Sequence, residues 1–164
     1  MESRAKSMGH AIHPILIVFP LGLLATSVIF DILYLITDRT GFQVSAAYTI
    51  AAGVIGGLVA AVFGLIDWRA IPAGTRAKRV GATHGLGNVV VLVLFAVSWL
   101  LRRGAENWEP NAGALVCSFA GIVLAGFTGW LGGELVERLG MSVSDEAGVN
   151  APSSLSRRPR ARGA

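Results

Sequence analysis

Charged residues are scarce in this chain. Lys, Arg, Asp and Glu together make up 15% of the 164 residues, whereas about a quarter of a typical soluble domain is charged. Hydrophobic residues reach 53% and the mean hydropathy is +0.61, an apolar excess too large for the core of a small soluble domain. The scarcity of charge therefore excludes an ordinary soluble protein and indicates that lipid surrounds most of the chain.

Cysteine is nearly absent, since Cys117 is the only one. One thiol cannot form an intrachain disulfide or a cysteine-based zinc site, and its place inside an apolar run indicates packing. The sequence also contains no Gly-x-Ser-x-Gly, no His-Glu-x-x-His and no P-loop motif. We therefore predict no catalytic residue, and the sequence favours a protein that is not an enzyme.

Acidic residues are fewer than basic ones, which gives a net charge of +4 and a pI of about 10.0. A basic balance can indicate nucleic-acid binding, but here the basic residues lie in short segments between apolar runs. That distribution is typical of loops on the cytoplasmic face of a membrane. We therefore predict the lipid bilayer as a partner and no nucleic acid.

Four apolar runs are long enough to cross a bilayer as helices, because about 20 residues at 1.5 Å each span roughly 30 Å. We predict these spans at residues 12–36, 45–66, 81–102 and 112–133. They form one transmembrane domain over 11–140, flanked by a short basic lead (1–10) and a disordered basic tail (141–164). Only helices satisfy their backbone in lipid without closing a barrel, so the predicted fold is all-α: an up-down-up-down four-helix bundle.

The first run begins at His13-Pro14 and carries Pro20 in its interior. We expect Pro20 to kink the helix or to open its hydrogen-bond ladder locally. A cleaved signal peptide ending near Ala25-Thr26-Ser27 is an alternative, although the hydrophobicity continues as far as Ile36. Residues 37–44 are polar and predict a short hairpin to the second span.

The distribution of Lys and Arg predicts the orientation. Of the 14 such residues, three (Arg39, Arg102 and Arg103) fall on one side of the predicted bundle, and the other eleven lie in the lead, the 67–81 loop and the segment from Arg138 onward. The positive-inside rule therefore places both termini in the cytoplasm. We predict a protein of the bacterial inner membrane.

Polar side chains interrupt the apolar runs at one predicted depth. His13 starts the first span, Asp67 ends the second, His84 and Asn88 start the third, and Glu134 ends the fourth. These ends meet at the cytoplasmic face of an antiparallel bundle, and residues four apart such as His84 and Asn88 share a helix face. This His/Asp/Asn/Glu cluster is the candidate site.

Three interpretations of the cluster stay open. A structural role leaves the side chains bonded to one another and to helix ends, without a ligand. In the second interpretation, His13 and His84 bind a b-type haem in an electron-transfer subunit with a redox partner protein, and Asp67, Asn88 or Glu134 supports an imidazole. In the third, His13, Asp67, His84 and Glu134 form a proton, ion or metal site.

Two other polar residues carry simpler expectations. Asp31 follows His13 by 18 residues, which is about 27 Å along a helix. We therefore place it at the outer interface, where it caps a helix end or pairs with Arg39 or Arg103. His10 precedes His13 by one turn and is expected to lie in water above the bilayer.

Glycines are frequent in the second and fourth runs. Gly53 and Gly57 have the small-xxx-small spacing that lets helix backbones approach closely. The sequence leaves open whether such faces pack within one bundle or between copies in a homo-oligomer. A histidine lies near the start of both the first and the third run, which is a weak similarity between the two halves, but the sequence contains no convincing internal repeat.

Several ordered motifs together resemble a bacterial family of predicted membrane proteins, domain of unknown function 2231. They are His13-Pro14, Phe19-Pro20-x-Gly22, Gly64-Leu65-Ile66-Asp67, His84-x-x-x-Asn88 and Gly132-Gly133-Glu134-Leu135-Val136, and the match runs from about residue 10 to 140. The resemblance implies a four-span inner-membrane protein without an assigned activity. Some relatives look joined to Rieske-type iron–sulfur domains, which implies electron transfer, but this chain has no Cys/His set for such a cluster.

Overall fold

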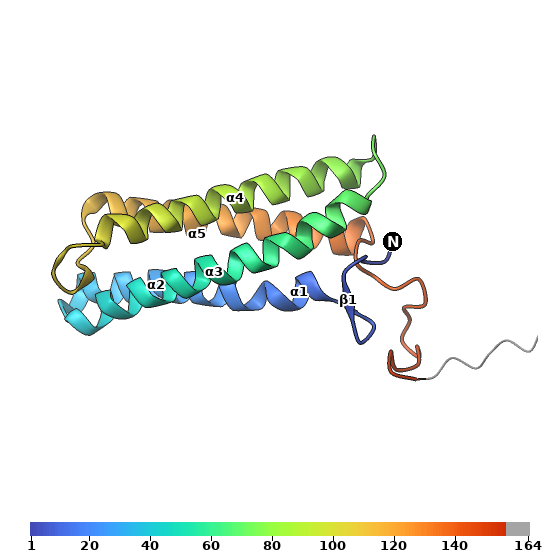
Figure 1. Cartoon of the computed structure of the whole chain (residues 1–164), viewed down its shortest axis with the longest axis horizontal. Helices are drawn as coiled ribbons and strands as arrows, with labels where there is room; N and C mark the ends of the chain where they lie inside the picture. Colours follow the sequence, from blue (N-terminus) through green and yellow to red (C-terminus); the bar gives the residue numbers. More distant parts are fainter. Residues whose placement is uncertain (157–164) are drawn as a thin grey trace, which may run out of the picture.

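The chain folds into a bundle of long helices (Figure 1). The computed structural model describes residues 1–156, so the part of the predicted tail at 157–164 lies outside the described residues. Within the described part, four helical segments are long and apolar enough to cross a membrane: Ile12–Thr37, Thr40–Ala70, Arg76–Arg102 and Glu106–Arg138. The predicted all-α four-helix fold is therefore confirmed.

The first segment consists of α1 (Ile12–Leu16) and α2 (Val18–Thr37), separated at Ile17. Pro20 has no N–H to donate to the carbonyl of Leu16, whereas Leu21 still donates to Ile17 (3.1 Å). Ile17 keeps helical dihedral angles (φ −64°, ψ −20°). The expected opening of the ladder at Pro20 is thus present, and the chain continues in the same direction.

The next helix begins earlier than the hydropathy indicates. α3 covers Thr40–Ala70, and the connection before it turns at Asp38, whose φ of 52° is left-handed. The polar hairpin expected over 37–44 is therefore shorter, and most of its residues are helical. Polar side chains can join a helix end because they reach water beyond the lipid core.

The second half of the chain forms another pair of antiparallel helices. α4 (Arg76–Arg102) begins one turn before the predicted span, and its cap Thr75 accepts a hydrogen bond from the Lys78 N–H. α5 (Ala112–Gly133) starts after a short helical turn, η1 (Glu106–Trp108), and continues into a π-helical turn, η2 (Glu134–Arg138). Capping side chains satisfy N–H groups that have no partner inside a helix.

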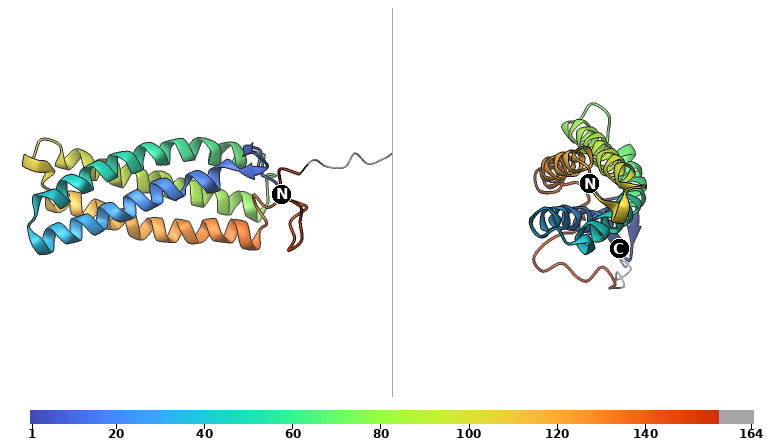
Figure 2. Two further views of the ribbon diagram at one scale, coloured as in Figure 1. Left: turned by 90° about the horizontal axis from the view of Figure 1, so that it is seen from below. Right: turned by 90° about the vertical axis from the view of Figure 1, so that its left-hand side faces the viewer.

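The helices follow one another around the bundle, so α2 lies diagonal to α4 and α3 lies diagonal to α5 (Figure 2). The lead, the α3–α4 loop and η2 lie at one end, which we call the terminal end. The α2–α3 and α4–α5 connections lie at the other end, which we call the loop end. The chain therefore runs up, down, up and down.

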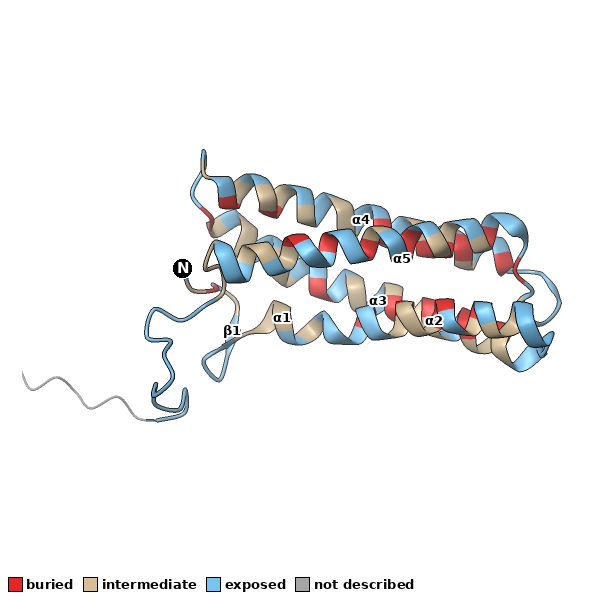
Figure 3. Cartoon of the chain, turned by 180° about the vertical axis from the view of Figure 1, so that it is seen from behind, coloured by how far each residue is buried: buried red, intermediate tan, exposed pale blue. Residues whose placement is uncertain are grey.

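The interior and the outer faces of the bundle differ in the way expected for a membrane protein. The core contains Leu24, Val28, Ile50, Val91, Phe95 and Ala125. Many other large apolar residues are exposed, and exposed positions occur along the whole length of the helices (Figure 3). Soluble proteins rarely expose apolar patches this large, so the outer faces fit a hydrocarbon environment.

Candidate functional site

The two histidines of the predicted cluster meet inside the bundle near the terminal end. His13 comes from α1 and His84 from α4, helices on opposite sides of the bundle. Their ring centroids lie 6.4 Å apart and the ring planes are perpendicular (89°). Residues 71 positions apart in the sequence thus face each other across the bundle axis.

Each imidazole is held by a backbone carbonyl of a neighbouring helix. Nδ1 of His13 lies 2.9 Å from the carbonyl oxygen of Ala60, and Nδ1 of His84 lies 2.8 Å from that of Thr128. A carbonyl oxygen can only accept, so Nδ1 carries the hydrogen in both rings. In the neutral form each Nε2 then carries a lone pair.

A glycine makes each of these carbonyls accessible. Side chains in a helix tilt toward its N-terminus, so the residue at i+4 lies over the carbonyl of residue i. Gly64 follows Ala60 by four residues, and Gly132 follows Thr128 by four. A Cβ at Gly64 would lie 2.9 Å from Cε1 of His13, and one at Gly132 would lie 3.2 Å from Cε1 of His84. Hydrogen at these positions lets the imidazole reach the helix backbone.

Asn88 adds a side-chain partner to one of the two rings. Its Nδ2 donates to the carbonyl of His84 (2.8 Å) and lies 3.3 Å from Nε2 of the same residue. Its Oδ1 accepts from the hydroxyl of Thr128 (3.1 Å). The predicted pairing of His84 and Asn88 on one helix face is therefore present, with Thr128 as an additional member.

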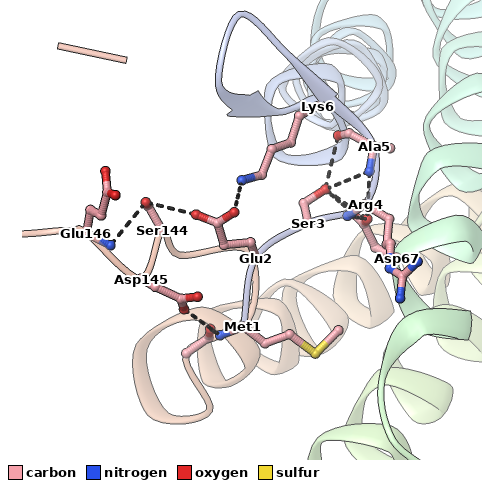
Figure 4. Close-up of polar contacts among 11 residues, drawn as sticks. Met1, Glu2, Ser3, Arg4, Ala5, Lys6, Asp67, Ser144, Asp145 and Glu146 are labelled. Carbon is pink, nitrogen blue, oxygen red and sulfur yellow. Dashed lines mark hydrogen bonds and ion pairs between the residues drawn. The ribbon is translucent and has the colours of Figure 1, made fainter. Parts of the chain in front are cut away.

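Asp67 binds a different part of the molecule (Figure 4). Its carboxylate accepts hydrogen bonds from the Ser3 hydroxyl (2.8 Å), the Arg4 N–H (2.8 Å) and the Ala5 N–H (3.2 Å). The lead after Ala5 forms a small hairpin of β1 (Lys6–Ser7) and β2 (His10–Ala11). Asp67 thus anchors the lead to the end of α3.

The lead also contacts the start of the tail (Figure 4). The Ser142 N–H donates to the carbonyl of Met1 (3.0 Å), and the Ser144 hydroxyl donates to the Glu2 carboxylate (3.0 Å). Hydrogen bonds from Lys6 and from Ser144 lower the pKa of Glu2. Where we expected disorder from residue 141 onward, the structure places these first tail residues against the lead, in turns without helix or strand.

Glu134 also has a partner away from the imidazoles. Its carboxylate forms an ion pair with Arg76 (2.6 Å), which joins the end of α5 to the start of α4. Nearby, Lys78 lies over the ring of Trp68, 3.9 Å from the centroid. Of the predicted cluster, His13, His84 and Asn88 therefore share one site, while Asp67 and Glu134 each fasten a helix end.

A second polar cluster lies at the loop end and is fully buried. The guanidinium of Arg102 donates to both oxygens of Asp31 at 2.6 Å each, and to the hydroxyls of Ser98 and Ser118 at 3.2 Å. Ser98 donates to the carbonyl of Ala114 (2.8 Å). Asp31, Arg102 and both serines have no exposed surface.

This cluster corrects the expectation for Asp31, whose partner is neither Arg39 nor Arg103. Arg102 lies at the last position of α4 and faces the interior, and its long side chain reaches the diagonal helix α2. Arg103 is exposed at the cap. Counting charges by position along the chain cannot distinguish two adjacent arginines that point in opposite directions.

The chain matches a family described as a predicted membrane protein, DUF2231, over residues 9–145. It belongs to this family. No curated protein and no solved structure matches the chain. The resemblance inferred from the ordered motifs is therefore confirmed, and with it the integral membrane class of the protein.

The DUF2231 motifs map onto the geometry of the site. His13 and Gly64 form one imidazole contact, and His84 and Gly132 form the other. Sequence reasoning missed Ala60 and Thr128, because a carbonyl that accepts from a side chain leaves no mark in the residue type. The glycines one turn later are the only sequence signal that could have located them.

Proposed function

We propose that His13 and His84 of this DUF2231 protein would hold one b-type haem, and that the protein is an electron-transfer module of the membrane. The observation that carries the proposal is the facing pair of imidazoles with Nδ1 already bonded to a carbonyl. Histidine ligands almost always donate their other ring N–H in this way. Sites for cofactors in helical bundles are commonly built from facing helices.

The separation of the rings supports a metal centre between them. A metal–nitrogen bond to histidine is about 2.0–2.1 Å, so two imidazoles on opposite sides of one ion have ring centroids roughly 6 Å apart. The observed separation is 6.4 Å.

The small number of protein ligands favours haem over a bare ion. Structural zinc takes four ligands from the protein, whereas a porphyrin supplies the four equatorial nitrogens of its iron. Among residues 1–156, the structure contains no group of three or more His, Cys, Asp or Glu side chains that could hold an ion.

The residues of the site have separable roles in this proposal. Ala60 and Thr128 orient the rings through their carbonyls, and Asn88 limits rotation of His84. Haem would supply the electron-accepting iron. We further propose that the terminal end faces the cytoplasm of a bacterial inner membrane, because the basic loop and lead lie there, and that a redox partner approaches from that side.

The absorption spectrum of the purified full-length protein tests the proposal. After expression with ample haem, a Soret band is expected that shifts on reduction and is lost in His13→Ala and in His84→Ala. His10→Ala is the matched control, because His10 is exposed in the lead hairpin. Absence of a Soret band after addition of haemin would overturn the haem assignment, and pH-dependent proton flux in vesicles would then favour the ion interpretation.

A further inference from the structure

The two imidazole contacts have the same construction in both halves of the chain. Each consists of a histidine, a carbonyl on the following helix and a glycine one turn after that carbonyl. The members are His13 with Ala60 and Gly64, and His84 with Thr128 and Gly132. The second histidine follows the first by 71 positions, and the second carbonyl and glycine follow theirs by 68.

The same two offsets recur at other buried contacts. A Cβ at Gly53 would lie 2.7 Å from the side chain of Leu24, and one at Gly121 would lie 2.8 Å from that of Phe95. Phe95 follows Leu24 by 71 positions and Gly121 follows Gly53 by 68. Agreement of the offsets at an independent contact argues against coincidence at the histidines.

Residues at equivalent positions of the two hairpins that face the bundle axis are also equally buried. Ser27 and Ser98, 71 positions apart, are both fully buried, and so are Ala46 and Ala114, 68 positions apart. The change from 71 to 68 means that equivalent positions on the two helices of a hairpin are three residues closer in sequence in the second hairpin than in the first. Because α2 is diagonal to α4 and α3 to α5 (Figure 2), a half-turn about the bundle axis approximately exchanges one hairpin with the other.

We propose that the chain is an internal duplication of one helical hairpin, and that Asp31 and Arg102 are positioning residues that set the register of the two copies. They occupy equivalent positions, 71 residues apart. In an exact repeat, the same charge would face itself across the axis and repel. Opposite charges instead join hairpin to hairpin. This inference does not depend on a ligand at the histidines.

A polar contact is needed to fix the register of the two hairpins, because lipid gives little preference for one register over another. Apolar side chains contact hydrocarbon as readily as one another, so van der Waals packing and polar contacts drive helix association in membranes. Slipping one hairpin by a helical turn, about 5.4 Å, would separate Asp31 from Arg102 and His13 from His84 together. A buried ion pair adds little net stability compared with apolar replacements, which fits a role in specifying the arrangement.

A charge exchange in the full-length chain tests the equivalence of the two positions. Asp31→Arg and Arg102→Asp each place like charges at the axis, so a large fall in monodisperse yield and in thermal midpoint is expected. The double variant Asp31→Arg/Arg102→Asp should recover most of that loss. Arg103→Asp is the matched control, because Arg103 is exposed.

A further change sharpens the same experiment. Ser118, which accepts from Arg102, corresponds to Ile50 in the first hairpin. Adding Ile50→Ser to the exchanged pair should therefore raise the thermal midpoint again, by supplying the missing acceptor. An exchanged protein no more stable than the worse single variant would overturn the proposed equivalence.

Cross-linking separates positioning from plain stability. Cysteines at positions 13 and 84, in a Cys117→Ala background, report the register through a short bis-maleimide. The apolar variant Asp31→Leu/Arg102→Met should remain folded but cross-link several-fold less than the chain with the ion pair. Equal cross-linking in both proteins would overturn the positioning role.

Discussion

The two imidazoles and the guanidinium of Arg102 illustrate how buried polar side chains find partners inside a membrane protein. With no water nearby, a buried donor needs an acceptor within the protein. The imidazoles donate to carbonyl oxygens of neighbouring helices, and the guanidinium of Arg102 donates to a carboxylate and to two serine hydroxyls. Both solutions require small residues next to the polar group.

The glycines behind the imidazoles lead to a first prediction. Gly64→Ala places a methyl group 2.9 Å from Cε1 of His13, so the ring must move and its hydrogen bond weakens. We expect a loss of about 1–3 kcal/mol in unfolding free energy, measured in detergent, with a smaller loss for Gly132→Ala. Gly85→Ala is the control, because its Cβ meets open space; an equal loss there would contradict the explanation.

The serines at the loop end lead to a second prediction. Ser98→Ala removes an acceptor from Arg102 in a fully buried site, and leaving a buried donor without its partner costs about 1–3 kcal/mol. Ser27→Ala is a matched comparison, since Ser27 is equally buried but bonds only Leu24 in its own helix. Unfolding measurements should show the larger loss for Ser98→Ala, and the reverse order would refute the role of Ser98.

At the scale of elements, the helices and the lead have different sources of stability. α4 and α5 begin at side-chain caps, Thr75 and Asn111, whereas the caps before α1, α2 and α3 make no such bond. The lead hairpin has two residues in each strand and is too short to be stable alone. It depends on Asp67 and on the tail for its position.

This dependence leads to a third prediction, on pH. Because hydrogen bonds lower the pKa of Glu2, its contacts stabilise the lead fully above the ordinary glutamate pKa of about 4.3. That stabilisation is lost as the pH falls through the lowered pKa. The protection factors of the amides of residues 1–11, which correct the exchange rates for the intrinsic effect of pH, should therefore fall at acidic pH, and Glu2→Gln should lower them at neutral pH as well. Protection factors of the wild-type lead that do not change with pH would contradict this prediction.

For the whole molecule, the orientation in the membrane gives a fourth prediction. With the terminal end in the cytoplasm, a cysteine replacing Glu106 at the loop end faces outward and one replacing Ala73 faces inward. In a Cys117→Ala background, a membrane-impermeant maleimide should label Glu106→Cys in intact cells but label Ala73→Cys only after permeabilisation. The opposite labelling would reverse the topology.

Much of the fold could be predicted from the sequence, because hydropathy and helix length respond to the bilayer directly. The ends of the helices were harder to predict. α3 and α4 begin at Thr40 and Arg76, in polar segments that hydropathy assigns to loops. Within the candidate site, the meeting of His13 and His84 followed from span order. The partners of Asp67 and Glu134 could not be predicted, because Asp67 binds the folded lead and Glu134 binds Arg76.

The sequence by itself determined the apolar surroundings, the helical class and the level of the histidines along the bundle, since each depends on residue type along one chain. Only the tertiary structure decided which arginine neutralises Asp31, which carbonyls hold the imidazoles and that the two hairpins repeat. These depend on the direction in which side chains point across the axis. In lipid, outward positions need only be apolar, so the repeat survives in the inward contacts and not in overall sequence identity.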